Sequence, residues 1–217
     1  MNTSSIPASR VWAVVLAGGR ASRMGGADKG LQTLHGATLA AIAVRRLREQ
    51  RGGSPGQIAI SANRNQARYA ALQVPVWGDT VPDFAGPLAG MLSALQQCQQ
   101  QADYLLTVPC DSPRFPLDLL QRLGHALTTA HADIAMAQAP DTEADGTPVL
   151  RRQPVFCLLR SQLAADLAAF LQSGGRKIGA WTQTHATVLV PFDAVGDDPQ
   201  AFANANTLDE LHRLETP

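Results

Sequence analysis

Glycine and basic residues are concentrated in one short segment near the start of the chain, residues 16–29, with the sequence LAGGRASRMGGADK. It contains four glycines, two arginines and one lysine. Glycine lets backbone N–H groups approach oxygen atoms closely, and Arg and Lys neutralise phosphate charge. The segment therefore indicates a loop that binds the phosphates of a nucleotide.

The spacing within this segment excludes two common phosphate-binding loops. A Walker loop requires G-x-x-x-x-G-K-[ST], whereas Lys29 follows Asp28 and precedes Gly30, so a P-loop hydrolase is excluded. The G-x-G-x-x-G pattern of dinucleotide-binding folds is also absent. The alternative is a flexible glycine turn with solvated arginines. It is disfavoured because the segment directly follows an apolar run, residues 11–16, that is typical of a buried strand.

A second polar segment, Pro-Cys-Asp-Ser-Pro at residues 109–113, follows another apolar run at 104–108. Ligands of α/β folds bind outside the carboxyl ends of the strands, which is where both segments are expected. A carboxylate there is a hard oxygen ligand of the kind that Mg²⁺ takes together with phosphates and water. Seen alone, Asp111 could equally form an Asx turn. Beside a phosphate loop, the sequence favours Asp111 as a Mg²⁺ ligand.

Strand-like and helical patterns alternate along the chain, which predicts an α/β fold with a mainly parallel sheet. Residues 140–148 are expected to form a polar loop, and Thr207 with Glu210 matches a capping box at the start of a last helix. Strands are predicted at 11–16, 58–62, 74–77, 104–108, 134–139, 155–159 and 187–190, and helices at 37–51, 87–101, 116–129, 162–172 and 177–183.

Composition limits the remaining possibilities. Eighteen basic and eighteen acidic residues give no net charge, so no overall field would attract nucleic acid or an anionic membrane. Cys98, Cys110 and Cys157 form no zinc-binding pattern and suit a reducing compartment. The chain lacks a signal-peptide pattern and any apolar run long enough to span a membrane. A single cytoplasmic domain, residues 1–217, is expected.

Several motifs together resemble the molybdenum cofactor guanylyltransferase family. Besides residues 16–29 and 109–113 they are AGPLAGM at 85–91, QPVF at 153–156 and ANANTLDEL at 203–211, so the likeness covers nearly the whole chain. The resemblance implies a three-layer α/β sandwich with a Rossmann-like sheet of the nucleotide-diphospho-sugar transferase type. It further implies that residues 11–111 form a nucleotide-binding half and residues 112–217 an acceptor-binding half.

The resemblance also implies the site residues. Gly18 in LAGG favours GTP, because members that use CTP tend to carry LAAG. Ser61 stands where relatives often have Asn, and Ala85 where they often have Pro, whereas Asn63 is retained. The nucleotide and its phosphates are expected to contact Leu16, Ala17, Gly18, Gly19, Lys29, Ser61, Asp79 and Asp111.

The implied reaction transfers GMP from GTP to the terminal phosphate of molybdopterin, with or without molybdenum, and releases pyrophosphate. Arg23, Lys29 and Asp111, with Mg²⁺ on Asp111, are expected to be catalytic. Asn204 and Asn206 are expected at the acceptor, and the product is expected to pass to molybdoenzyme apoproteins or their chaperones. Arg151, Arg152, Arg176 and Lys177 either contact the acceptor or form a solvated surface.

Three alternatives to this function stay open. One is a related nucleotidyltransferase that uses CTP, another is one that uses a sugar phosphate acceptor, and the third is a non-catalytic module that binds nucleotide and delivers cofactor. The simultaneous presence of Lys29 and Asp111 argues against the last, because a pure binding module would not need both.

Overall fold

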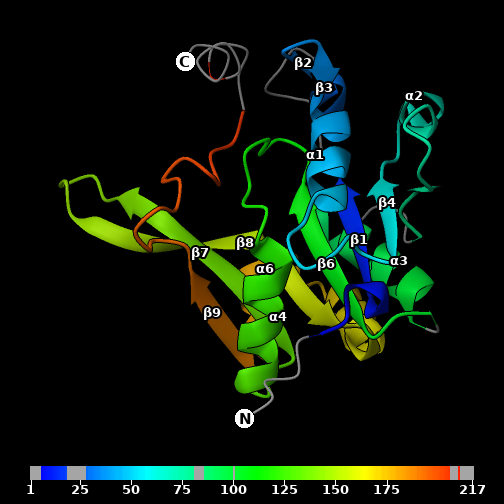
Figure 1. The fold of residues 1–217 in the computed structure, drawn as a ribbon. Helices are drawn as coiled ribbons and strands as arrows, with labels where there is room; N and C mark the ends of the chain where they lie inside the picture. Colours follow the sequence, from blue (N-terminus) through cyan, green and yellow to red (C-terminus); the bar gives the residue numbers. More distant parts are fainter. Residues whose placement is uncertain (1–5, 19–27, 81–85, 100, 206–209, 211–217) are drawn as a thin grey trace.

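A seven-stranded sheet forms the centre of the protein in a computed structural model, which describes residues 6–18, 28–80, 86–99, 101–205 and 210 (Figure 1). The strand order is β5-β4-β1-β6-β8-β7-β9. Neighbouring strands run parallel except on the two sides of β8, which is antiparallel to both β6 and β7. The strands are β1 (Val11–Leu16), β4 (Gln57–Ser61), β5 (Val76–Trp77), β6 (Tyr104–Pro109), β7 (Ile134–Thr142), β8 (Pro148–Arg160) and β9 (Thr187–Pro191).

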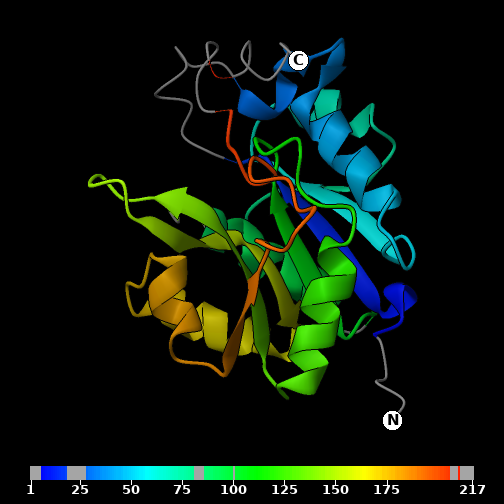
Figure 2. The same ribbon diagram turned by 60° about the vertical axis from the view of Figure 1, so that its left-hand side comes forward.

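Helices cover both faces of this sheet. One face is covered by α1 and α4, and the other by α3, α5 and α6. Figure 2 shows α5 and α6 on the opposite side of the sheet from α4. The predicted three-layer α/β sandwich with a mainly parallel sheet is confirmed. The bounds of these helices are α1 (Leu39–Arg48), α3 (Pro87–Cys98), α4 (Leu119–Thr129), α5 (Ala164–Gln172) and α6 (Ile178–Thr182).

Strand β1 is apolar along its whole length because helices pack against both of its faces. Val11, Ala13 and Val15 belong to the core under α1 and α4, whereas Val14 and Leu16 belong to the core under α3. Successive side chains of a strand point to opposite faces, so a strand covered on both sides has no solvent-facing positions for polar residues. This explains the unbroken apolar run that precedes the glycine-rich segment.

The predicted helix at 37–51 is too long at both ends. Ala37–Thr38 is strand β3, which pairs with β2 (Thr33–Leu34) in a small hairpin. The Thr38 hydroxyl accepts a hydrogen bond from the Ala41 N–H at 3.2 Å, so Thr38 caps α1 and the helix begins at Leu39. A five-residue helix, α2 (Gln66–Ala70), was not predicted at all.

The polar loop predicted at 140–148 is too long, because β7 continues to Thr142 and β8 begins at Pro148. The outer halves of these strands form a hairpin that projects from the body of the molecule (Figures 1 and 2). Arg151 contacts Asp141 and Glu143 across it. The predicted helix at 116–129 likewise begins later, at Leu119.

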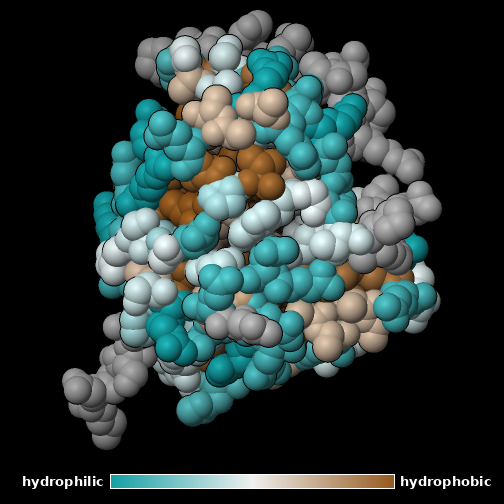
Figure 3. Space-filling view, turned by 90° about the vertical axis from the view of Figure 1, so that its right-hand side faces the viewer, coloured by the Kyte–Doolittle hydropathy of each residue, from teal (hydrophilic) through white to brown (hydrophobic). Residues whose placement is uncertain are grey.

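Hydrophilic and hydrophobic residues are unevenly distributed over the surface. Figure 3 shows one face on which hydrophilic residues predominate and several hydrophobic residues gather in the upper middle. No helix in the described part of the chain is long and apolar enough to cross a membrane. The capping box at Thr207 lies outside the described residues, and the division into two halves stays a prediction.

Candidate functional site

The carboxyl ends of β1, β4 and β6 lie side by side at one edge of the sheet. Leu16 is in register with Ser61 on one side and with Pro109 on the other. Two backbone hydrogen bonds extend this pairing into the loops: the Ala17 N–H donates to the Ser61 carbonyl at 2.9 Å, and the Cys110 N–H donates to the Leu16 carbonyl at 3.2 Å. The glycine-rich segment and the Asp111 segment therefore begin next to each other.

An ion pair connects these two segments. The Lys29 Nζ lies 3.2 Å from Asp111 Oδ2, and the two side chains are 26% and 19% exposed. Lys29 begins a short 3-10 helix, η3 (Lys29–Leu31), and Asp111 follows β6. Both side chains are thus partly exposed to solvent.

The side chain of Asp28, the residue before Lys29, is held by two residues that were not among the predicted site residues. Its two carboxylate oxygens accept hydrogen bonds from the Tyr69 hydroxyl at 2.5 Å and from Asn65 Nδ2 at 2.9 Å. Tyr69 is fully buried on α2. Its only sequence signal is that of an ordinary core aromatic residue, which explains why it was missed.

Asp79, predicted near the nucleoside, follows β5 and is paired with Asn63. Asn63 Nδ2 donates to Asp79 Oδ2 at 2.6 Å, and the Asp79 N–H donates to Asn63 Oδ1 at 2.7 Å. Burial raises the pKa of the Asp79 carboxyl, and the hydrogen bond from Asn63 partly opposes that shift. The retained Asn63 thus orients Asp79.

Ser61 is only 2% exposed, beneath α3. A Cβ at Gly90 would lie 2.6 Å from the Ser61 hydroxyl oxygen and 3.1 Å from Leu16 Cδ2, so only glycine lets α3 approach these strands so closely. The structure therefore packs the Ser61 side chain against α3, and its contact with a nucleotide stays a prediction.

Asn204 reaches the same edge of the sheet from near the end of the chain. The Ser112 hydroxyl donates to Asn204 Oδ1 at 2.6 Å, and the Ala205 N–H donates to the Asp111 carbonyl at 2.7 Å. Ala205 also packs with Leu34 of β2. Figure 2 shows the segment after β9 crossing toward the loop that follows β6. Asn204 is an exposed residue there, next to the Asp111 segment.

The donor set at Asp111 is compatible with Mg²⁺. Mg²⁺ commonly binds one or two carboxylates together with substrate phosphates and water, rather than a cage of protein ligands. Within the described ranges no group of three or more His, Cys, Asp or Glu side chains could hold a metal ion. A single partly exposed carboxylate therefore fits a magnesium ion that arrives with a nucleotide.

Three of the predicted site residues, Gly19, Arg23 and Asn206, lie outside the described residues. Their predicted contacts with nucleotide, phosphate and acceptor therefore stay predictions.

Two of the basic residues considered for the acceptor make contacts within their own segments. Arg151 pairs with acidic residues of the projecting hairpin. Arg176 donates to the backbone carbonyls of Leu171 and Gly175 at the end of α5. These local contacts support the solvated-surface interpretation for both.

Comparisons with known proteins identify the family. A family model described as MobA-like NTP transferase domain matches residues 13–188. The chain is 56% identical over 210 residues to the molybdenum cofactor guanylyltransferase of Albidiferax ferrireducens, covering 97% of this chain and 98% of that protein. It is 54% identical over 209 residues to the molybdenum cofactor guanylyltransferase of Ralstonia pickettii, covering 96% and 98%.

Solved structures are similar in fold. The molybdopterin-guanine dinucleotide biosynthesis protein A of Archaeoglobus fulgidus superposes with a TM-score of 0.72 at 20% identity, covering 94% of this chain and 96% of that one. The 4-diphosphocytidyl-2C-methyl-D-erythritol synthase of Anaerococcus prevotii gives a TM-score of 0.72 at 10% identity, covering 96% and 95%. At such identities the likeness concerns the fold alone.

Proposed function

The chain belongs to the family of MobA-like NTP transferase domains, and from this membership we propose that it transfers GMP from GTP to the terminal phosphate of molybdopterin. The family predicted from the motifs is thereby confirmed, and the chain is a nucleotidyltransferase. The observation that carries the proposal is the 56% identity to a molybdenum cofactor guanylyltransferase over 97% of the chain. The Lys29–Asp111 pair supports it, because it brings a cation and a carboxylate together next to the end of β6.

In the proposed reaction, an oxygen of the molybdopterin phosphate attacks the α-phosphorus of GTP. The bond from that phosphorus to the oxygen bridging it to the β-phosphorus breaks, and pyrophosphate leaves. A phosphomonoester has a second pKa of about 6, so the nucleophile is already ionised at neutral pH and needs no general base. The protein must instead overcome repulsion between two polyanions by positioning them and neutralising charge.

In the proposal, four residues position the substrates and neutralise their charge. Lys29 contacts the phosphates of GTP, and the Asp111 carboxylate holds Mg²⁺, which supplies further positive charge when bound. Arg23 contributes a second cation from the glycine-rich segment. Asn204 lies beside the Asp111 segment and contacts the acceptor.

Gly18 supports GTP as the nucleotide. A Cβ at this position would lie 3.9 Å from Asn63 Nδ2 and from the Ser61 carbonyl oxygen, which is ordinary van der Waals contact. Packing against the described residues therefore does not require glycine at position 18. The relatives named as guanylyltransferases support the same choice.

The proposed setting is the cytoplasm, which suits three buried cysteines that are all unpaired. The product would pass to molybdoenzyme apoproteins or their chaperones.

The test is a pyrophosphate-release assay with GTP, CTP and ATP, each with and without molybdopterin and Mg²⁺. Release with GTP that requires molybdopterin is expected. Preference for CTP would support the related cytidylyltransferase instead, and GTP binding without turnover would support a cofactor-delivery module.

A further inference from the structure

We propose that Tyr69 is a positioning residue for the transfer reaction, which holds Lys29 in place through the residues on either side of it. This inference rests on the proposed function, in which Lys29 contacts the phosphates of GTP. It concerns a side chain on α2, outside the loops that carry the predicted site.

Tyr69 contacts both sequence neighbours of Lys29. Its hydroxyl donates to Asp28 Oδ1 at 2.5 Å. A Cβ at Gly30 would lie 2.5 Å from the same hydroxyl oxygen and 3.2 Å from two ring carbons, so the tyrosine ring rests directly on the Gly30 backbone. Because Asp28 and Gly30 are both held, the backbone of Lys29 between them has little freedom.

Asn65 reinforces this arrangement. It stands at the N-terminal boundary of α2 in the left-handed region, with φ of 53°, and its side chain makes no capping hydrogen bond to the helix. Its amide nitrogen instead donates to Asp28 Oδ2 at 2.9 Å. The Asn65 side chain thus holds Asp28 and does not cap α2.

Asp28 is held through its side chain and its backbone. Both of its carboxylate oxygens already accept a hydrogen bond from α2 or its N-terminal boundary. Its backbone carbonyl accepts hydrogen bonds from the Leu31 N–H at 3.1 Å and from Gln32 Nε2 at 3.3 Å, at the η3 turn. Asp28 therefore connects α2 to the turn that carries Lys29.

The expected consequence is a loss of turnover when the Tyr69 hydroxyl is removed. Tyr69→Phe keeps the ring and removes the hydrogen bond to Asp28. Small misplacements of a catalytic group reduce rates strongly, so kcat is expected to fall about tenfold while KM for GTP changes less than about twofold. Tyr104→Phe is the matched control, because Tyr104 is the other tyrosine of the chain. It begins β6, whereas Asp111 follows the carboxyl end of that strand.

A double-mutant cycle with Lys29→Ala separates positioning from a general structural role. If Tyr69 acts through Lys29, Tyr69→Phe has little further effect in the Lys29→Ala protein, so the two losses are not additive. An equal loss, about tenfold, in both backgrounds would overturn the inference and leave the proposed function standing. Asn65→Ala gives a second test of the same coupling if Tyr69→Phe does not fold.

The activity of the wild-type enzyme distinguishes a failure of the proposed function from a failure of the inference about Tyr69. If it releases no pyrophosphate with any of the three nucleotides, the proposed function fails, and the inference fails with it. If wild type is active and Tyr69→Phe matches the Tyr104→Phe control in kcat, only the inference fails.

Discussion

The ammonium nitrogen of Lys29 lies 3.2 Å from a carboxylate oxygen of Asp111, a residue 82 positions later in the chain. The pair joins the loop after β1 to the loop after β6 across the carboxyl edge of the sheet. The two side chains carry opposite charges and attract each other. When GTP and Mg²⁺ bind, the proposal requires Lys29 to contact phosphate and Asp111 to contact the metal ion.

Lys29→Ala should reduce the transferase rate by about 100-fold or more, because a charge contact to the reacting phosphates is lost. The measurement is pyrophosphate release at saturating GTP and molybdopterin. Arg10→Ala is the control, since Arg10 forms an exposed ion pair with Asp103 at the other end of β1 and β6. Near-wild-type turnover in Lys29→Ala would remove Lys29 from the mechanism.

Asp111→Asn should abolish the response of the rate to added Mg²⁺. The amide is similar in shape but lacks the negative charge that strengthens binding of a hard divalent cation. A titration of the rate with Mg²⁺ measures this, with Asp103→Asn as the control at the opposite end of β6. An unchanged Mg²⁺ dependence would place the metal on another residue.

Asn204→Ala should raise KM for molybdopterin by about tenfold, the size of one hydrogen bond to a charged group. KM for GTP should stay nearly constant, which makes the nucleotide an internal control. Steady-state kinetics with each substrate varied in turn provides both values. A parallel rise in the two KM values would indicate that Asn204 only supports the Asp111 loop through Ser112.

Asp197→Asn should lower the free energy of unfolding at pH 7 by about 1 kcal/mol. Hydrogen bonds from Arg122 lower the pKa of the Asp197 carboxyl. A lowered pKa in the folded state stabilises the protein above the unfolded value of about 3.9, and this stabilisation is lost as the pH falls through the folded value.

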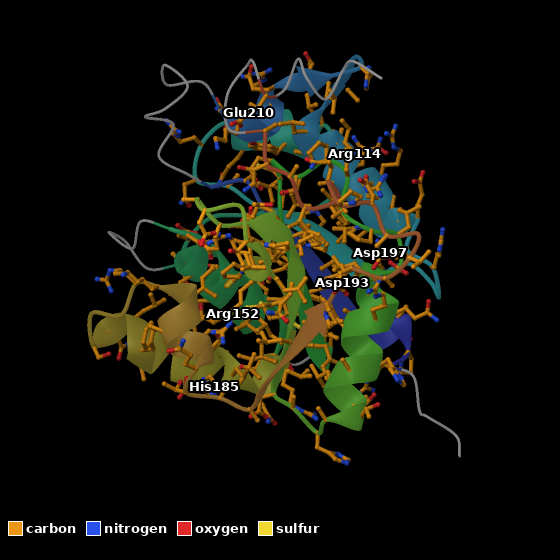
Figure 4. The ribbon with its side chains drawn as sticks, turned by 90° about the vertical axis from the view of Figure 1, so that its left-hand side faces the viewer. Arg114, Arg152, His185, Asp193, Asp197 and Glu210 are labelled. Atoms are coloured by element: carbon orange, nitrogen blue, oxygen red, sulfur yellow. The ribbon has the colours of Figure 1, made fainter. Side chains whose placement is uncertain are left out.

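Urea unfolding of wild type and Asp197→Asn at about pH 7 and about pH 3 tests this dependence. The difference between the two proteins should shrink at the lower pH. Asp193→Asn is the control, because Asp193 is exposed on the same loop (Figure 4). A difference that stays constant with pH would show that the Arg122–Asp197 pair does not contribute through its charge.

The sequence by itself determined the α/β class, the order of the main elements and the two segments that form the candidate site. Apolar runs and helical periodicity are local, so β1, β6 and the glycine-rich segment could be located from them. It also placed Lys29 and Asp111 at the same edge of the sheet, because the carboxyl ends of parallel strands meet there.

Only the tertiary structure decided how these residues are held. The antiparallel direction of β8, the contact of Tyr69 with Asp28 and Gly30, and the close approach of Gly90 to Ser61 join segments that are distant in sequence. Such contacts depend on how complete elements pack, and no local pattern encodes them. The physical reason is that side-chain periodicity specifies which face of an element is buried, but not which partner covers it.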